Sequence, residues 1–280
     1  MPFHISAELS YTVLHRSTVL LNLHALSTPN QTLTDESFTI TEGVTCECFP
    51  IEAGENRYAR IDTCGLKRVA ITYSVTAETR PSARHVHEID RVPVARLERR
   101  ALPYLYPSRY CQSDRLGRLA AKQFAHIRHP LAQAAAISDW IFENIDYLPA
   151  TTDSGTSAFD TVTQRAGVCR DFAHLAIAFC RALSIPARYF SGYACQMEFP
   201  DFHACFEACV GNQWFIFDPT RLSSPNGLVR IATGRDAADA SFATIFGSMR
   251  LDSMKVSCTA VDFQPLSRSE LEGKAVLLEP

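Results

Sequence analysis

The chain has 280 residues, of which 46% are hydrophobic and 20% are charged, and its formal net charge is −3. This balance is ordinary for a globular protein of about two domains and excludes a disordered chain. The charge favours neither nucleic acid nor an anionic membrane as a partner, and no apolar run approaches the ~20 residues of a membrane span.

The beginning of the chain lacks the basic region and the long apolar region of a secretory signal. We therefore expect a cytoplasmic protein. The ten cysteines form no Cys-x-x-Cys pair. In a reducing compartment we expect them to be free thiols, most of them buried among apolar residues.

The first hundred residues are rich in Thr, Val, Ile, Tyr and Phe and predict β-structure. Strands are expected at 7–14, 18–26, 36–48, 58–62 and 66–75. In the last of these, Val69, Ile71, Tyr73 and Val75 alternate with small or polar residues, which indicates one buried face. An antiparallel β-sandwich domain is expected over 1–105, including a proline-rich connector that begins near residue 81.

The second part, 106–280, predicts a domain in which helices are followed by an antiparallel sheet, so the fold class is α+β. Ala-rich segments at 116–127 and 131–145 have helical apolar spacing, and Pro130 suits the start of the second. A polar loop or short helix at 154–164 comes before a third helix, which begins near Cys169. Strands follow to the end of the chain.

The segment 167–174 reads Gly-Val-Cys-Arg-Asp-Phe-Ala-His and places Cys169 where this third helix begins. Unpaired N–H groups and the helix dipole stabilise a thiolate there, and the thiolate is the nucleophilic form of cysteine. The same N–H groups can donate to an oxyanion. Gly167 is expected to provide the tight turn into the helix. The alternative is that Cys169 is a buried core thiol.

A hairpin is predicted over 202–220, because Gly211-Asn212 separates two runs of strand-forming residues. If Val210 faces Gln213, then Asp218 faces Cys205 and lies one diagonal step from His203. Diagonal neighbours are ~7–8 Å apart between backbones, a gap that an imidazole and a carboxylate can close. The spacing therefore predicts a His203–Asp218 pair, in which the carboxylate orients the imidazole for proton transfer.

These segments resemble the transglutaminase-like superfamily, and in particular bacterial transglutaminase-like cysteine proteases with an N-terminal β domain. The resemblance rests on the cysteine motif at 167–173, the stretches at 183–189 and 191–193, the histidine and aspartate motifs at 201–204 and 214–220, and a downstream segment at 234–239. It implies a papain-like core in the 106–280 domain and a catalytic triad of Cys169, His203 and Asp218. It requires no metal or organic cofactor.

One residue departs from the family pattern. Members often carry Trp two residues after the catalytic histidine, and this chain has Cys205. On the predicted strand Cys205 shares the face of His203, which makes it a candidate resolving thiol. A zinc site of His203, Cys205 and Cys209 is disfavoured, because the two cysteines lie ~13 Å apart on a strand.

Several other polar residues have less support as catalytic groups. His174 follows Cys169 by five residues, which turns it ~140° around a helix. Arg170 and Asp171 suit capping and surface pairing in the first helical turn. Glu207 is expected to be a polar neighbour of the triad, and Gln164 is an alternative side-chain donor to the oxyanion.

The resemblance implies thiol acyl transfer on peptide or isopeptide amides, with hydrolysis favoured over crosslinking of Gln to amines. The expected partner is a protein or peptide substrate. Two alternatives remain: a catalytically silent binding or scaffold module, and a thiol redox protein that forms a reversible Cys169–Cys205 bond. The sequence does not decide the substrate or the oligomeric state.

Overall fold

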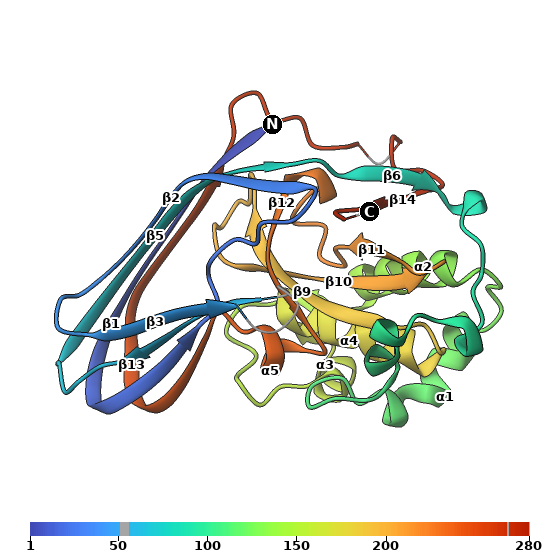
Figure 1. The fold of residues 1–280 in the computed structure, drawn as a ribbon. Coiled ribbons are helices and arrows are strands. Elements are labelled where there is room, and N and C mark those ends of the chain that lie inside the picture. Colours follow the sequence, from blue (N-terminus) through green and yellow to red (C-terminus); the bar gives the residue numbers. More distant parts are fainter. Residues whose placement is uncertain (51–55, 268, 280) are drawn as a thin grey trace.

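The computed structural model describes residues 1–50, 56–267 and 269–279. Within these residues the chain builds two six-stranded antiparallel sheets and a group of helices. In Figure 1 the long strands of the first sheet form one end of the molecule, and the helices lie at the other end beside the second sheet.

The first sheet has the strand order β2-β5-β1-β4-β3, and β13 pairs with the remaining edge of β1. Its strands are β1 (Pro2–Leu21), β2 (Gln31–Ile40), β3 (Thr45–Pro50), β4 (Arg57–Asp62), β5 (Arg68–Thr79) and β13 (Ala243–Thr259). The predicted alternation in β5 is confirmed, because Val69, Ile71, Tyr73 and Val75 are all buried.

These strands form one curled sheet, where the sequence predicted the two layers of a sandwich. The strand β1 pairs with β5 through its first half and with β4 only through its last residues. Between these two parts its register with β13 shifts several times. Such shifts mark bulges, which bend a strand and increase its twist. A 20-residue strand can therefore serve both halves of the sheet.

The second sheet has the strand order β12-β9-β10-β11-β14-β6. Its strands are β6 (Ser82–His85), β9 (Ala187–Ala194), β10 (His203–Val210), β11 (Gln213–Phe217), β12 (Leu228–Gly234) and β14 (Lys274–Leu277). A short parallel pair joins β7 (Asp146–Tyr147) to β8 (Ala166–Gly167). Short 3-10 helices are η2 (Val86–Glu88), η3 (Val94–Arg96), η4 (Arg99–Leu105) and η5 (Pro225–Gly227).

The helices confirm the predicted α+β order. They are α1 (Ser113–Phe124), α2 (Pro130–Asn144), α3 (Ala158–Gln164), α4 (Cys169–Ala182) and α5 (Ala237–Ala240). Pro130 is the first residue of α2, as expected. The central helix is α4, which is buried from Asp171 to Arg181 because it packs against β10, α1, α2 and α3. No helix of the described part of the chain is long and apolar enough to cross a membrane.

Strands cross the predicted boundary at residue 105 in both directions. The strand β13, late in the chain, belongs to the first sheet, and β6 adds to the second sheet beside β14. The division into 1–105 and 106–280 therefore remains a prediction about folding units, while the hydrogen-bonded sheets join the two parts.

Candidate active site

The hairpin that carries two of the predicted site residues has the predicted register. Val210 pairs with Gln213, and the ladder continues to Phe206 opposite Phe217. The turn residues Gly211 and Asn212 have φ values of 63° and 59°. A two-residue turn with both φ values positive matches the right-handed twist of the flanking strands, and this explains the Gly-Asn sequence.

The structure brings His203 and Asp218 together. The His203 Nε2 atom lies 2.8 Å from Asp218 Oδ2. Three further donors hold the carboxylate: the Thr220 N–H at 2.9 Å, the Thr220 hydroxyl at 2.6 Å and the Ser223 N–H at 3.0 Å. Burial alone would raise the pKa of Asp218, but His203 and the Thr220 donors lower it below its usual value. The carboxyl group is therefore an anion in a fixed orientation.

Cys169 is the first residue of α4, as predicted, and it is partly exposed. The Asp171 carboxylate accepts a hydrogen bond from the Val168 N–H at 3.0 Å and pairs with Arg170, which confirms its capping role. The reason for Gly167 differs from the prediction. A Cβ atom at this position would lie 2.8 Å from Asp171 Cβ, so glycine is needed for close packing.

His203 connects Cys169 to Asp218. Burial opposes protonation of its ring, but the Asp218 and Cys205 charges, the hydrogen bond that the ring donates to Asp218 and the nearby Cys169 raise the pKa of His203 well above 6.5. Its Nδ1 atom is buried and has no hydrogen-bond partner within normal distance among the described residues. With Asp218 at Nε2, this arrangement leaves Nδ1 for exchange of a proton with the thiol.

Sequence reasoning missed Tyr147. The β7–β8 pairing places Tyr147 beside Gly167, and its ring packs edge-on against Phe172 with centroids 5.8 Å apart. Its hydroxyl is near enough to Cys169 for that residue to affect it: burial and the Cys169 charge raise the pKa of Tyr147 to about 12. The sequence held no signal for this contact, because the two residues are joined only through the β7–β8 pair.

Cys205 lies against the His203–Asp218 pair. It is fully buried, and burial together with the Asp218 charge raises the pKa of its thiol to about 12. A buried thiol of this kind is a poor nucleophile, which argues against a resolving role. Ligand atoms of His203, Cys205 and Asp218 lie within 4.8 Å of one another. This set differs from the zinc set considered from the sequence, because Asp218 takes the place of Cys209.

The remaining candidates have no hydrogen bond to Cys169, His203 or Asp218 among the described residues. His174 is buried, accepts a hydrogen bond from the Ala237 N–H at 3.1 Å and stacks on Tyr110, so it points away from Cys169 as predicted. Gln164 is exposed at the end of α3. Glu207 binds two buried arginines, and although burial opposes it, these charges lower its pKa to about 2.

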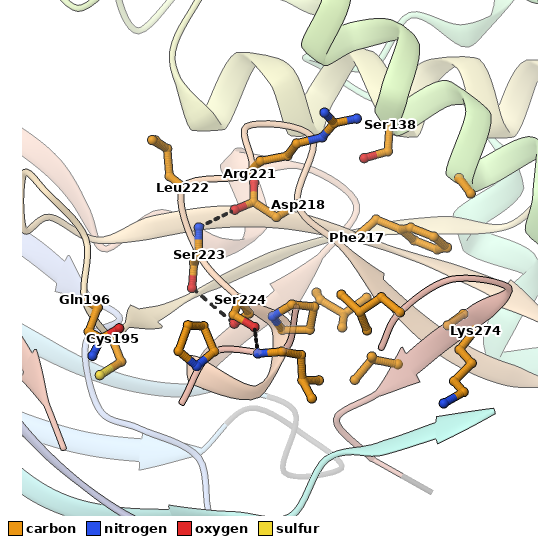
Figure 2. A pocket seen from close by; sticks show the side chains of 18 of the residues that line it. Ser138, Cys195, Gln196, Phe217, Asp218, Arg221, Leu222, Ser223, Ser224 and Lys274 are labelled. Carbon is orange, nitrogen blue, oxygen red and sulfur yellow. Dashed lines mark hydrogen bonds between the residues drawn. The ribbon is translucent and has the colours of Figure 1, made fainter. Parts of the chain in front are cut away.

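A cavity of about 530 Å³ lies beside Asp218. Ile216, Val276 and Leu266 give it an apolar wall, and Asp218, Ser223 and Lys274 are among its polar residues. Figure 2 shows Asp218 at the edge of this space, joined to Ser223 by a hydrogen bond. Neither Cys169 nor His203 lines the cavity. The cavity therefore adjoins the site at Asp218 and not at Cys169 or His203.

Two family models match the chain. The transglutaminase-like superfamily model matches residues 117–219, and the bacterial transglutaminase N-terminal domain model matches residues 1–100. An uncharacterized protein of Mycobacterium leprae is 31% identical over 144 residues, which are 48% of this chain and 51% of that protein. One of Mycobacterium tuberculosis is 33% identical over 81 residues, 29% and 26% of the two chains. The chain thus spans about half or less of these curated relatives.

A solved structure provides a match over the whole chain. The crystal structure of a "putative cysteine protease" from Cytophaga hutchinsonii is 46% identical and superposes with a TM-score of 0.96, covering 100% of this chain and 98% of that one. This one match covers the residues of both family models. The chain belongs to the transglutaminase-like superfamily.

Proposed function

We propose that this protein is a cysteine-dependent enzyme that transfers the acyl group of peptide or isopeptide amides. One observation carries the proposal: a buried His203–Asp218 pair, 2.8 Å between Nε2 and Oδ2, whose imidazole is near enough to Cys169, at the start of α4, for Cys169 to raise its pKa. A nucleophile, a base and a group that orients the base are the three parts that such catalysis requires.

The reaction has two halves. The Cys169 thiolate attacks the amide carbonyl carbon, and the resulting oxyanion is stabilised by N–H groups at the start of α4. His203 then gives its proton to the amide nitrogen, the C–N bond breaks, and the amine leaves a thioester on Cys169. In the second half His203 accepts a proton from water, which attacks the thioester and releases the acid and the thiol.

We favour water over an amine as the acceptor, so that the reaction is hydrolysis. Support comes from the name of the Cytophaga hutchinsonii protein, which describes a protease and is 46% identical over the whole chain. An amine such as a lysine side chain in place of water would give crosslinking by the same first half. A silent binding or scaffold module is the alternative of another class.

We also propose a reducing, cytoplasmic setting. The ten cysteines are all free, and exposed Cys48 and Cys64 lie among them with partly exposed Cys169. A thiol nucleophile stays active only while it is not oxidised.

Acylation of Cys169 tests the function. The protein is incubated with p-nitrophenyl acetate, and each cysteine is examined by peptide mass spectrometry in wild type, His203→Ala and Cys169→Ser. We expect Cys169 to be acylated far faster than exposed Cys48, and His203→Ala to remove this difference. Added methylamine then separates the two acceptors, because hydrolysis yields acetate and amine transfer yields N-methylacetamide.

The same experiment can contradict the proposal. If Cys169 reacts no faster than Cys48 and is indifferent to His203→Ala, the triad is not a working unit. The binding-module alternative would then replace the enzyme.

A further inference from the structure

The three groups His203, Cys205 and Asp218 form a set that a chain with Trp at position 205 does not have. Their ligand atoms lie within 4.8 Å of one another, and all three side chains are buried. They offer one imidazole nitrogen, one sulfur and one carboxylate oxygen. Zinc binds this combination of ligands, and three protein ligands leave a fourth position open.

The spacing suits a tetrahedral ion. With bonds of about 2.0 Å to nitrogen and oxygen and 2.3 Å to sulfur, neighbouring ligand atoms around zinc lie roughly 3.3–3.6 Å apart. The His203–Asp218 separation is 2.8 Å, so these two groups must part slightly. The Cys205 sulfur must move inward by roughly 1.3 Å at most, since no pair of ligand atoms exceeds 4.8 Å.

The carboxylate is already held in place by groups that are not ligands. Thr220 bonds to Asp218 Oδ1 through its N–H and its hydroxyl, and the Ser223 N–H bonds to Oδ2. Outer hydrogen bonds of this kind orient a metal ligand and raise metal affinity. These hydrogen bonds can therefore still orient the Asp218 carboxylate when a metal ion replaces the imidazole as its partner.

Charge also favours the ion. A divalent cation with one thiolate, one carboxylate and a neutral imidazole has a net charge of zero. A neutral cluster avoids the cost of a buried uncompensated charge. Soft sulfur and imidazole ligands select zinc over magnesium or calcium, which prefer oxygen.

The cavity beside Asp218 supplies a route. It has a volume of about 530 Å³ and is lined by Asp218 and Ser223. In Figure 2 Asp218 lies at its edge, next to the loop that carries Ser223 and Ser224. An ion that enters there reaches the carboxylate first, and a water from the cavity can take the fourth position.

We propose that His203, Cys205 and Asp218 form an inhibitory site for one thiophilic divalent cation, of which Zn²⁺ is the representative. On binding, the Cys205 thiol and the Nε2 atom of His203 each release a proton to solvent, and the His203–Asp218 hydrogen bond is replaced by two metal bonds. No electron is transferred. The imidazole is then no longer free to exchange a proton with Cys169, and a chelator restores it.

Metal binding is measured on the full chain without any substrate. Competition with a chromophoric chelator measures the affinity for Zn²⁺, and Co²⁺ replaces zinc as a probe, since a thiolate ligand to Co²⁺ gives a near-ultraviolet charge-transfer band. We expect one ion per chain. Cys205→Ala is expected to weaken Zn²⁺ binding by at least about 100-fold and to remove the Co²⁺ band.

The matched control is Cys169→Ser, which keeps all three proposed ligands. It should bind Zn²⁺ nearly as wild type does, with the Co²⁺ band intact. Binding that is lost in Cys169→Ser but kept in Cys205→Ala would overturn the proposal, because the ion would then sit on the nucleophile. Binding that neither variant changes would place the ion elsewhere and overturn it as well.

Two further measurements distinguish the loss of a metal ligand from the loss of the fold. Thermal unfolding of Cys205→Ala and of Cys205→Ser, which keeps a polar atom, identifies a variant that has lost Zn²⁺ binding by losing its fold. Because no step uses activity, the proposal can fail while the acyl-transfer function holds, and the reverse is also true.

Discussion

At the scale of single residues, His203 is under two opposing influences. Burial favours the neutral ring, and Asp218 with Cys169 favours the protonated ring, so that the pKa is raised well above 6.5. Protonation of His203 therefore stabilises the fold fully below its ordinary pKa. This stabilisation is lost as the pH rises through the higher pKa of the folded state.

Asp218→Asn tests this balance. With the charge removed, burial dominates, and we expect the pKa of His203 to fall and the alkaline limb of the pH–activity profile to move to lower pH. The ring protons of His203 in an NMR titration report the shift directly. A His203 titration that Asp218→Asn leaves unchanged would mean that another group sets its protonation.

Tyr147→Phe tests the hydroxyl beside the nucleophile. This hydroxyl is near enough to Cys169 for the Cys169 charge to raise its pKa. If the hydroxyl helps to bind the oxyanion, its loss should lower kcat for ester substrates by about 100-fold, with little change in KM. Alkylation of Cys169 by iodoacetamide forms no oxyanion and should be unaffected. Tyr106→Phe, at a residue 65% exposed, is the control.

At the scale of elements, the close approach of β9 and β12 beside His203 requires a glycine at position 192. This glycine pairs with His203 across β9 and β10, and a Cβ atom there would lie 2.5 Å from the Val229 backbone oxygen. Gly192→Ala must therefore push β12 away from β9. We expect a loss of about 1–3 kcal/mol in the free energy of unfolding, measured with denaturant. Gly117→Ala is a suitable control, because no atom from elsewhere in the described part of the chain lies within 4 Å of its Cβ position.

At the scale of the whole molecule, buried amides join the two sheets. The Gln31 side chain donates to the Leu26 and Arg230 carbonyls at 2.7 and 2.9 Å and accepts from the Arg230 N–H at 2.7 Å. Asn56 makes a similar two-way contact with Thr233. Gln31→Ala removes the side-chain partner of the Leu26 carbonyl and of the Arg230 N–H, while the Arg230 carbonyl still accepts from the Leu26 N–H.

We expect Gln31→Ala to lower the free energy of unfolding by about 2–4 kcal/mol, since each unpaired buried group costs about 1–3 kcal/mol. Circular dichroism and Trp fluorescence followed in denaturant should then no longer coincide, because the two sheets unfold separately. Coincident transitions with unchanged stability would show that other contacts hold the sheets together. Exposed Gln164→Ala serves as the control.

Elements whose interactions are local could be predicted from the sequence. The Gly211–Asn212 turn sets the register of β10 and β11, so counting was enough to pair His203 with Asp218. The start of α4 at Cys169 follows from the helical spacing of the residues after it. By contrast, the pairing of β1 with β13 joins residues more than 200 positions apart. The sequence pattern within either strand does not indicate which strand it pairs with.

The sequence by itself determined the family, the α+β class, the hairpin and the residues proposed to react, because turns and helix starts depend on neighbours in the chain. Tertiary structure alone decided that the first sheet is curled, that β6 and β13 cross between the two parts, and that Tyr147 contacts Cys169. It also decided that Asp218 supplies the third ligand of the proposed metal site and that a cavity adjoins it. These features depend on side chains that meet only when distant segments pack.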